Sequence, residues 1–321
     1  MLHFSYIGTS FSGSQQQVVA GSQIVRTVQG IIEQAFQCIK LVDRSRLTLA
    51  SRTDAGVHAL ANTLHFDAVY SKEHMRESRE PDPQMFLLGL NTVLDRWNEP
   101  IRIWRAERVP PDFNCRSAAI SREYLFRLAV MKPSVKNAGP LAPLTATESF
   151  RSLVYTGEFN EELLFKGAEL LSGVHSFRNF TTAESLQEKG GSPTKPMVVT
   201  VKPSQAILGD VWPFEYSDQI CFYDLFFKSN SFFYHQIRGM MGCLIQVASK
   251  RIPLSVVEDL LTGKEPAQRG QPHATPTVSP CGLYLRKIEY NPNDLVMPDG
   301  STKSDDLPVD VLKSFVKRSI L

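Results

Sequence analysis

The stretch MLHFSYIGT, residues 1–9, opens the pattern from which the fold can be predicted. Apolar and polar side chains alternate from Leu2 to Tyr6, which is typical of a half-buried strand rather than of a signal or transit peptide. A polar loop follows, and TVQGIIEQAFQCIKL at 27–41 then repeats apolar side chains at helical spacing, with Thr27 placed to cap the helix. The chain is therefore expected to begin with a strand, a loop and a helix.

The next segments continue this pattern as far as the proline pair at 110–111. We expect strands at 46–51, 62–70 and 101–109 and a helix at 84–94. The resulting order, β-α-β-β-α-β, is that of the ferredoxin-like split unit. A charged insertion at 71–83 interrupts it.

The remainder of the chain repeats an α/β pattern. Strands are predicted at 121–130, near 219–229 and at 281–290, with helices at 160–173 and from about 236 to 250 and a polar insertion at 185–196. We therefore predict an α+β protein of two ferredoxin- or RRM-like halves, with mixed, mainly antiparallel sheets, helices on one face and a cleft between the halves. The expected domains are 1–110 and 111–290, followed by a polar tail with one short helix at 291–321.

Composition narrows the class of protein without naming its function. A chain of 321 residues with 42% hydrophobic and 21% charged residues is globular and long enough for two cores, and it contains no apolar run that would span a membrane. A net charge of +2 neither requires nor excludes a nucleic acid partner. The five cysteines are scattered without a C-x-x-C pair, which argues against a disulfide framework or zinc ribbon and for a reducing compartment.

A concentration of chemically active side chains occurs in ASRTDAGVHALAN, residues 50–62, between two predicted strands. Asp54 followed by Gly56 is common turn chemistry, but a glycine also allows a ligand to approach a carboxylate at the end of a strand. Ser51, Asp54 and His58 hold the residue types of a hydrolase triad, although no strand-to-helix elbow follows Ser51. We expect His58 to pack or form hydrogen bonds within the loop.

The string SRTDAGVHAL resembles the signature of the tRNA pseudouridine synthase A family, with eight consecutive matches from Arg52 to Ala59. The resemblance extends in order and spacing over residues 1 to about 290 and is closest to the eukaryotic pseudouridylate-synthase-like branch. Its further strings are YIGTSFSG, TVQGIIEQAF, VPPDFNCRSAAISREYLFRL, HSFRNF, FFYHQIRGMMGCLIQV and GLYLRKIEY. One position departs from it, because Gly13-Ser14-Gln15 stands where the family commonly has G-W-Q, so an aromatic RNA contact is expected to be missing.

The resemblance implies an isomerase that converts specific uridines of tRNA, in the anticodon arm, to pseudouridine. The base is detached at C1′–N1, turned over and rejoined through C5, so the implied chemistry needs no cofactor and no metal. Its implied partner is tRNA, and a homodimer is compatible with it, whereas no membrane partner is expected. The residues leave open whether the protein is mitochondrial or cytoplasmic.

The resemblance also assigns roles to residues of the first half. Asp54 becomes the catalytic carboxylate, which attacks the flipped nucleotide or removes a sugar proton. Arg52 becomes a substrate-binding residue that fills the space of the flipped base or contacts the backbone. Without the resemblance, Arg52 is equally consistent with an ordinary surface arginine.

Three more substrate-binding residues are implied in the second half. Tyr124 would stack on the uracil, Arg238 would pair with the catalytic carboxylate, and Leu283 would pack beneath the base. From the pattern alone, Tyr124 and Leu283 could be core residues and Arg238 could reach a helix surface. Further phosphate contacts are expected from basic residues of both halves, namely Arg116, Arg122, Lys250 and Arg251.

A second function class stays compatible with the sequence. The chain could be a catalytically silent RNA-binding module on the same fold, which the altered G-W-Q loop would favour. The intact Asp54, Tyr124 and Arg238 favour the enzyme instead.

Overall fold

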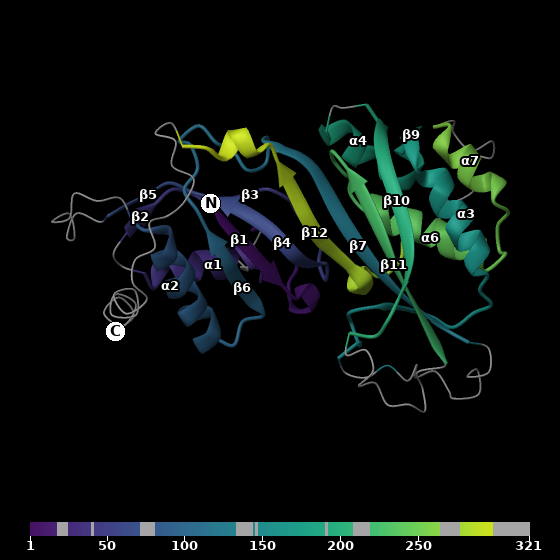
Figure 1. The fold of residues 1–321 in the computed structure, drawn as a ribbon, viewed down its shortest axis with the longest axis horizontal. Helices are drawn as coiled ribbons and strands as arrows, with labels where there is room; N and C mark the ends of the chain where they lie inside the picture. Colours follow the sequence, from purple (N-terminus) through teal and green to yellow (C-terminus); the bar gives the residue numbers. More distant parts are fainter. Residues whose placement is uncertain are drawn as a thin grey trace. The chain divides into compact units, whose positions relative to one another are not determined.

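The computed structural model describes residues 1–17, 25–39, 42–70, 81–132, 144, 147–189, 192–207, 219–263 and 277–297 (Figure 1). Several helices occur together with mixed, mainly antiparallel strands, which confirms the predicted α+β class. The strands are β1 (Leu2–Tyr6), β2 (Val42–Arg44), β3 (Thr48–Leu49), β4 (His58–His65), β5 (Ala68–Tyr70), β6 (Ile101–Ala106), β7 (Ala119–Met131), β8 (Leu153–Tyr155), β9 (Gly173–Ser176), β10 (Thr194–Ser204), β11 (Ile220–Ser229) and β12 (Leu283–Tyr290). The α-helices are α1 (Val28–Gln37), α2 (Pro83–Arg96), α3 (Glu161–Leu171), α4 (Ala183–Lys189), α6 (Gln236–Ala248) and α7 (Ser255–Leu261).

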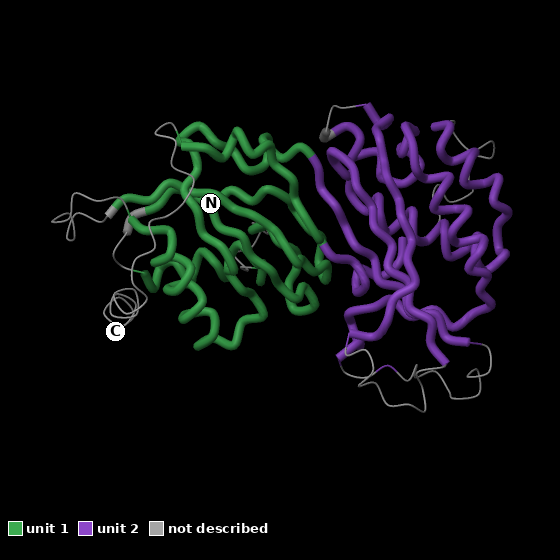
Figure 2. Tube along the Cα trace, in the orientation of Figure 1, with its two compact units in different colours: residues 1–120, 285–321 green, residues 121–284 purple. Residues whose placement is uncertain are grey.

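The chain forms two compact units (Figure 2). Unit 1 contains residues 1–120 and 285–321, and unit 2 contains residues 121–284. The sequence instead places its boundaries at 110/111 and 290/291. The return of the last strand to unit 1 has a physical basis, because the Tyr290 hydroxyl donates to the Cys115 carbonyl at 2.9 Å and lies 2.5 Å from Thr63 Oγ1.

Unit 1 follows the expected β-α-β-β-α-β succession, as β1, α1, β3, β4, α2 and β6. Strand β1 pairs antiparallel with β4 on one side and β6 on the other, and β3 pairs with β4. The predicted strand at 62–70 is divided, because β4 ends at His65 and β5 pairs separately with β2. Thr27 caps α1 as predicted, since its side chain accepts a hydrogen bond from Gly30 N at 3.1 Å.

Unit 2 has the strand order β7-β11-β10-β9, with every pair in that order antiparallel, and β8 adds to β7 in parallel. The prediction of a mixed, mainly antiparallel sheet is therefore confirmed. Helix α3 packs against α6 and against β10. Along the first half of β10, Lys195, Met197 and Val199 are buried and their neighbours are exposed, so at this strand one side of the sheet is covered.

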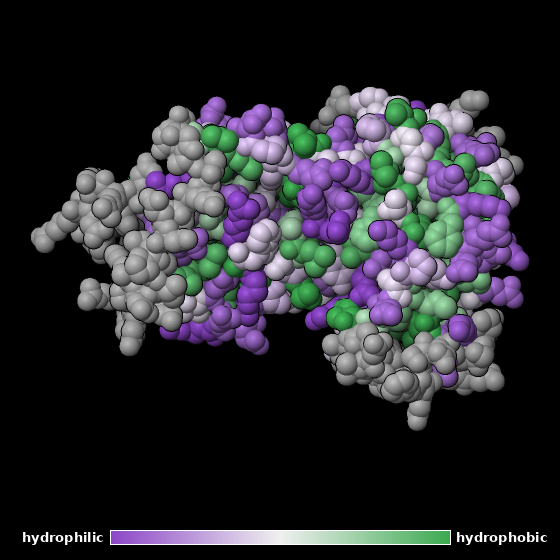
Figure 3. All heavy atoms as spheres, viewed as in Figure 1, coloured by the Kyte–Doolittle hydropathy of each residue, from purple (hydrophilic) through white to green (hydrophobic). Residues whose placement is uncertain are grey.

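One region of unit 2 that was predicted to be a polar insertion contains regular secondary structure. The polar insertion predicted at 185–196 contains most of helix α4 and the start of β10, an eleven-residue strand that we did not predict. The outer side of β9 and β10 leaves apolar side chains in solvent, with Val174 69% and Val198 55% exposed. Hydrophobic and hydrophilic side chains are interspersed on the face of the molecule shown in Figure 3.

Within the described ranges, none of the helices has the length and apolar character needed to cross a membrane. The predicted insertion at 71–83 lies outside the described residues over 71–80, and the tail lies outside them from residue 298.

Candidate active site

The segment that carries Asp54 is shorter than the sequence indicates, because β4 already begins at His58. Its start is fixed to that strand, since Ala50 N donates to the Thr63 carbonyl at 3.0 Å and Asn62 Nδ2 donates to the Ser51 carbonyl at 3.0 Å. Residues 50–57 therefore form a connection between β3 and β4 whose first residues are hydrogen-bonded to β4.

Thr53 is the fixed point of this connection and lies directly before Asp54. Its backbone N–H donates to Ser14 Oγ at 2.8 Å, and its carbonyl accepts from Ser14 N at 3.0 Å. Its side-chain Oγ1 lies 2.8 Å from the Tyr6 hydroxyl. Because Thr53 and Ser14 are both buried, these bonds are shielded from water, and they set the position of the adjoining Asp54 backbone.

Two glycines make the tight packing of this segment possible. A Cβ atom on Gly8 would lie 1.9 Å from the Val57 carbonyl oxygen, so no other residue fits there. Gly56 has φ +79°, a left-handed conformation that favours glycine, and its N–H donates to the Phe11 carbonyl at 3.2 Å. The loop before α1 and the loop carrying Asp54 thus support each other.

His58 is a structural residue of this support. Its ring is fully buried, and Nδ1 accepts a hydrogen bond from Gly8 N at 3.1 Å. This confirms the prediction of a hydrogen-bonding histidine, with its partner in the loop after β1. Because Nδ1 is already engaged by a backbone amide, the arrangement is not that of the Ser51, Asp54 and His58 hydrolase triad.

Asp54 and Arg52 differ from their neighbours in exposure. Ser51 and Thr53 are buried, whereas Arg52 is exposed and Asp54 is partly exposed. The anchored connection thus leaves Arg52 accessible to solvent and Asp54 partly accessible, while the residue before each of them is buried. This is what a carboxylate that reacts with an external ligand requires.

The structure explains why Gly13-Ser14-Gln15 stands in this chain where the family commonly has G-W-Q. Ser14 is completely buried and directed at Thr53, so this position is part of the support of the Asp54 segment rather than of the surface. Sequence reasoning missed this role because it depends on hydrogen bonds between residues 39 positions apart.

In unit 2, Tyr124 lies on β7 and is 7% exposed, with its ring against Phe232 at 5.0 Å between centroids. Its neighbour Arg122 donates through Nη1 to the Asn230 carbonyl at 3.0 Å. Both contacts connect β7 to the segment after β11 that leads into α6. Leu283, at the start of β12, is 5% exposed.

Arg238 lies in the first turn of α6 and is partly buried. Its Nε donates to the Val278 carbonyl at 2.7 Å, and its Nη1 lies 2.8 Å from His235 Nε2. A guanidinium can only donate, so His235 Nε2 is the acceptor. Two contacts therefore orient the Arg238 guanidinium, and its pairing with the catalytic carboxylate stays a prediction.

A lysine that the sequence prediction did not consider supports the same segment. Lys195 on β10 is 5% exposed, and its Nζ donates to the Ser231 carbonyl at 3.2 Å and approaches the Phe233 ring centroid at 3.5 Å. The period-two alternation of Lys195 with Met197 and Val199 could have revealed its inward orientation if the strand had been recognised.

Three of the four basic residues expected to contact phosphates are exposed. Arg116 is exposed and its Nε donates to the Leu49 carbonyl at 3.2 Å, and Lys250 and Arg251 are exposed after α6, whereas Arg122 is partly buried. Their roles in binding RNA stay predictions. In the described part of the chain, no group of three or more His, Cys, Asp or Glu side chains could hold a metal ion.

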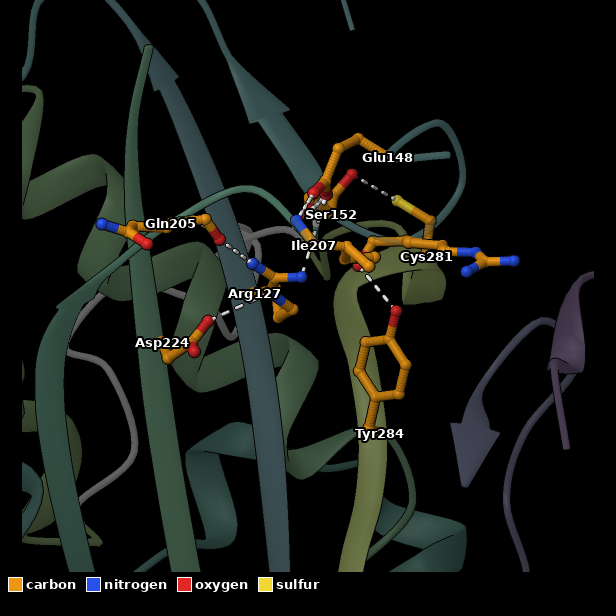
Figure 4. Close-up of polar contacts among 9 residues, drawn as sticks. Arg127, Glu148, Ser152, Gln205, Ile207, Asp224, Cys281 and Tyr284 are labelled. Atoms are coloured by element: carbon orange, nitrogen blue, oxygen red, sulfur yellow. Dashed lines mark hydrogen bonds and ion pairs between the residues drawn. The ribbon is translucent and has the colours of Figure 1, made fainter. Parts of the chain in front are cut away.

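A second polar cluster in unit 2 is structural (Figure 4). Arg127 Nε donates to Asp224 Oδ1 at 3.1 Å, and Nη1 lies 3.8 Å from an oxygen of the fully buried Glu148. Glu148 also accepts from Ser152 Oγ at 3.1 Å and from the Ile207 backbone N–H. The Glu148 carboxylate thus has hydrogen-bond partners besides Arg127. The buried pair of Arg127 and Glu148 links the surrounding segments to β7 and β11, so we interpret it as structural.

The five predicted site residues are thus distributed over both units. Arg52 and Asp54 belong to unit 1, whereas Tyr124, Arg238 and Leu283 belong to unit 2. In unit 1 the loop that carries Arg52 and Asp54 is held by buried hydrogen bonds of Thr53, whereas the three residues of unit 2 lie on β7, α6 and β12.

These features define an α+β protein in which an anchored loop carries a partly exposed aspartate. Comparison with known proteins gives its family. The family model described as tRNA pseudouridine synthase matches residues 168–291. The chain is 33% identical over 297 residues to human tRNA pseudouridine synthase-like 1, covering 90% of this chain and 89% of that protein. It is 31% identical over 288 residues to tRNA pseudouridine synthase A of Streptococcus suis strain 98HAH33, covering 89% and 96%.

A further relative, tRNA pseudouridine synthase A of Albidiferax ferrireducens, is 31% identical over 310 residues, covering 96% of this chain and 98% of that protein. The chain therefore belongs to the tRNA pseudouridine synthase family and, with it, to the isomerases. This confirms the resemblance noted in the sequence.

Proposed function

We propose that this chain isomerises specific uridines of tRNA to pseudouridine, with Asp54 as the catalytic residue. The observation that supports this most strongly is the presentation of Asp54: a partly exposed carboxylate directly follows a buried Thr53 that is anchored by three hydrogen bonds. A residue that only closes a turn needs no such support, whereas a reacting group must be held in position.

The reaction breaks the N1–C1′ bond of uridine and forms a C5–C1′ bond, and the proton on C5 is released while N1 gains one. Atoms and electrons balance within the nucleotide, so no cofactor or metal enters the proposal. The Asp54 carboxylate either attacks the nucleotide and is later displaced, or removes a sugar proton and returns it. Both steps need a uridine that has left its stack, so we propose that the target nucleotide is flipped out.

The remaining residues bind the flipped uridine. We assign Arg52 to the RNA backbone or the space vacated by the base, since its exposed guanidinium can bind phosphate and stack. Tyr124 is assigned to stacking on the uracil and Leu283 to packing beneath it. Arg238 is assigned to keeping the Asp54 carboxylate ionised. Two hydrogen bonds already orient its guanidinium, so little side-chain conformational entropy is lost on binding.

The alternative is a catalytically silent RNA-binding module. It was favoured by the altered G-W-Q loop, but Ser14 is buried and supports Thr53, so the substitution does not by itself weaken the case for catalysis. A homodimer is compatible with the proposed function. Sedimentation of the purified chain would test it.

Pseudouridine mapping separates the two functions. Cellular tRNA from cells with and without the protein is treated with a carbodiimide that marks pseudouridine, and the marked positions are read by reverse transcription. The enzyme predicts marks at specific positions that disappear without the protein and return when it is restored. An identical map in both cells, together with tRNA binding by the purified chain, would favour the silent module.

A further inference from the structure

Tyr234 is an aromatic residue that the proposed chemistry does not use, although it lies close to Arg238 in the sequence. It occupies the segment between β11 and α6 and is 50% exposed. Its ring is stacked on that of His235, with centroids 3.6 Å apart and an angle of 22° between the planes. A large apolar ring held half in solvent is what a stacking partner for a planar ligand requires.

The backbone around Tyr234 is fixed on both sides. Tyr234 N donates to Ser185 Oγ at 3.1 Å, and Thr181 Oγ1 donates to the Tyr234 carbonyl at 2.9 Å. The next residue, His235, has φ +58°, a left-handed conformation that is uncommon for residues other than glycine. A residue in such a conformation persists only when its surroundings determine it, and these residues often lie at binding sites.

The preceding residues complete this support. Phe233 N donates to Gln236 Oε1 at 2.9 Å, and the buried Lys195 ammonium lies over the Phe233 ring. The backbone from Phe233 to Gln236 is therefore held before any ligand binds. Since the ring is presented by an ordered segment, little conformational entropy is lost when a ligand stacks on it.

The stack is also connected to the proposed active site. His235, which carries the Tyr234 ring on one side, accepts a hydrogen bond from Arg238 Nη1 at 2.8 Å. An aromatic surface beside the proposed active site suits the base of a neighbouring nucleotide, because that base can stack on the ring.

We propose that Tyr234 binds, by stacking, an unpaired nucleobase next to the target uridine. The inference rests on the proposed function for the identity of the RNA, but it concerns a different nucleotide and a different residue. Stacking on an aromatic ring is tolerant of sequence, because every base has a π face. Tyr234 is thus expected to contribute affinity for single-stranded RNA rather than to act on the reacting atoms.

The test uses the full-length chain with Asp54→Asn, which prevents turnover, and fluorescence anisotropy of a labelled 12-nucleotide oligouridylate. Tyr234→Ala is expected to weaken binding by about 5- to 150-fold, the range found when a base-stacking aromatic is replaced by alanine. Tyr234→Phe keeps the ring and is expected to bind within about twofold of the parent. With Asp54 restored, Tyr234→Ala is expected to raise KM for a tRNA transcript by a similar factor and to leave kcat unchanged.

Trp104 provides a matched control because it is 49% exposed and its ring also lies against a histidine, His3, at 5.0 Å. Trp104→Ala is expected to bind oligouridylate like the parent. The proposal is overturned if Tyr234→Ala binds normally, if Tyr234→Phe loses as much affinity as Tyr234→Ala, or if Trp104→Ala loses as much. Absence of turnover in the chain with Asp54 intact would contradict the proposed function and leave the binding result for Tyr234 standing.

Discussion

Replacing Ser14 by alanine removes one atom from the support of Asp54 and tests whether that support matters. The Ser14 hydroxyl oxygen accepts the Thr53 N–H at 2.8 Å, and Ser14 is completely buried. Alanine keeps the second bond, from Ser14 N to the Thr53 carbonyl, but leaves the buried Thr53 N–H without this acceptor. A buried donor deprived of its partner costs about 1–3 kcal/mol of unfolding free energy.

Ser14→Ala is therefore expected to lower the melting temperature and to displace the Asp54 carboxylate. About 1–3 kcal/mol corresponds to a melting temperature roughly 2–12 °C lower for a domain of this size. A displacement of the Asp54 backbone by about 1 Å is expected to lower kcat by up to about 100-fold. KM should change less than kcat, because we expect most of the affinity for RNA to come from phosphate contacts of basic residues outside this loop.

Circular dichroism melts and tritium release from tRNA labelled at C5 of uridine measure the two effects. Ser10→Ala is the matched control, because Ser10 is exposed in the same loop. The reasoning is refuted if Ser14→Ala melts and turns over like Ser10→Ala, or if the loss of activity is entirely an increase in KM.

Three further outcomes follow from other contacts. Gly8→Ala should lower unfolding free energy by at least about 2 kcal/mol in denaturant melts, because its Cβ would lie 1.9 Å from the Val57 carbonyl oxygen; a normal melt would contradict this packing. Arg238→Met, which abolishes the bond to the Val278 carbonyl, should lower kcat in the tritium assay by at least about 100-fold; wild-type turnover would contradict its assigned role. Burial raises the pKa of Cys243 to about 12, so at pH 8 far less thiolate is present than in a free thiol, and iodoacetamide should label Cys243 only after unfolding; rapid labelling of the folded chain would contradict this burial.

Much of the fold could be predicted because hydrophobic periodicity reports burial directly. The strand at Leu2–Tyr6, the helix capped by Thr27 and the long strand containing Tyr124 were all indicated by their spacing. Strand β10 was missed because Lys195 and two prolines made its start resemble a polar insertion. A buried lysine is compatible with a strand only when a distant partner such as Ser231 is present, and local sequence does not reveal that partner.

Only the residues of the candidate loop, and not their support, could be predicted from the sequence. The order Arg52-Thr53-Asp54 with Gly56 identified the loop, because those residues are adjacent in the sequence. Its support by Ser14 and Tyr6 was not predictable, since these contacts join residues that are 39 and 47 positions apart. The same limit explains why Ser14 was interpreted only as a missing aromatic residue.

The central claim is that the Asp54 carboxylate performs the chemistry, and Asp54→Asn tests it most directly. Asparagine keeps the size of the side chain and removes its nucleophilic and basic capacity. The account predicts that tritium release from tRNA labelled at C5 of uridine falls by at least about four orders of magnitude, comparable to the loss of an essential catalytic residue. Filter binding of the same tRNA should change by less than about threefold, because phosphate contacts provide most of the affinity. Tritium release by Asp54→Asn at an appreciable fraction of the wild-type rate would contradict the account and reduce the segment to a structural turn.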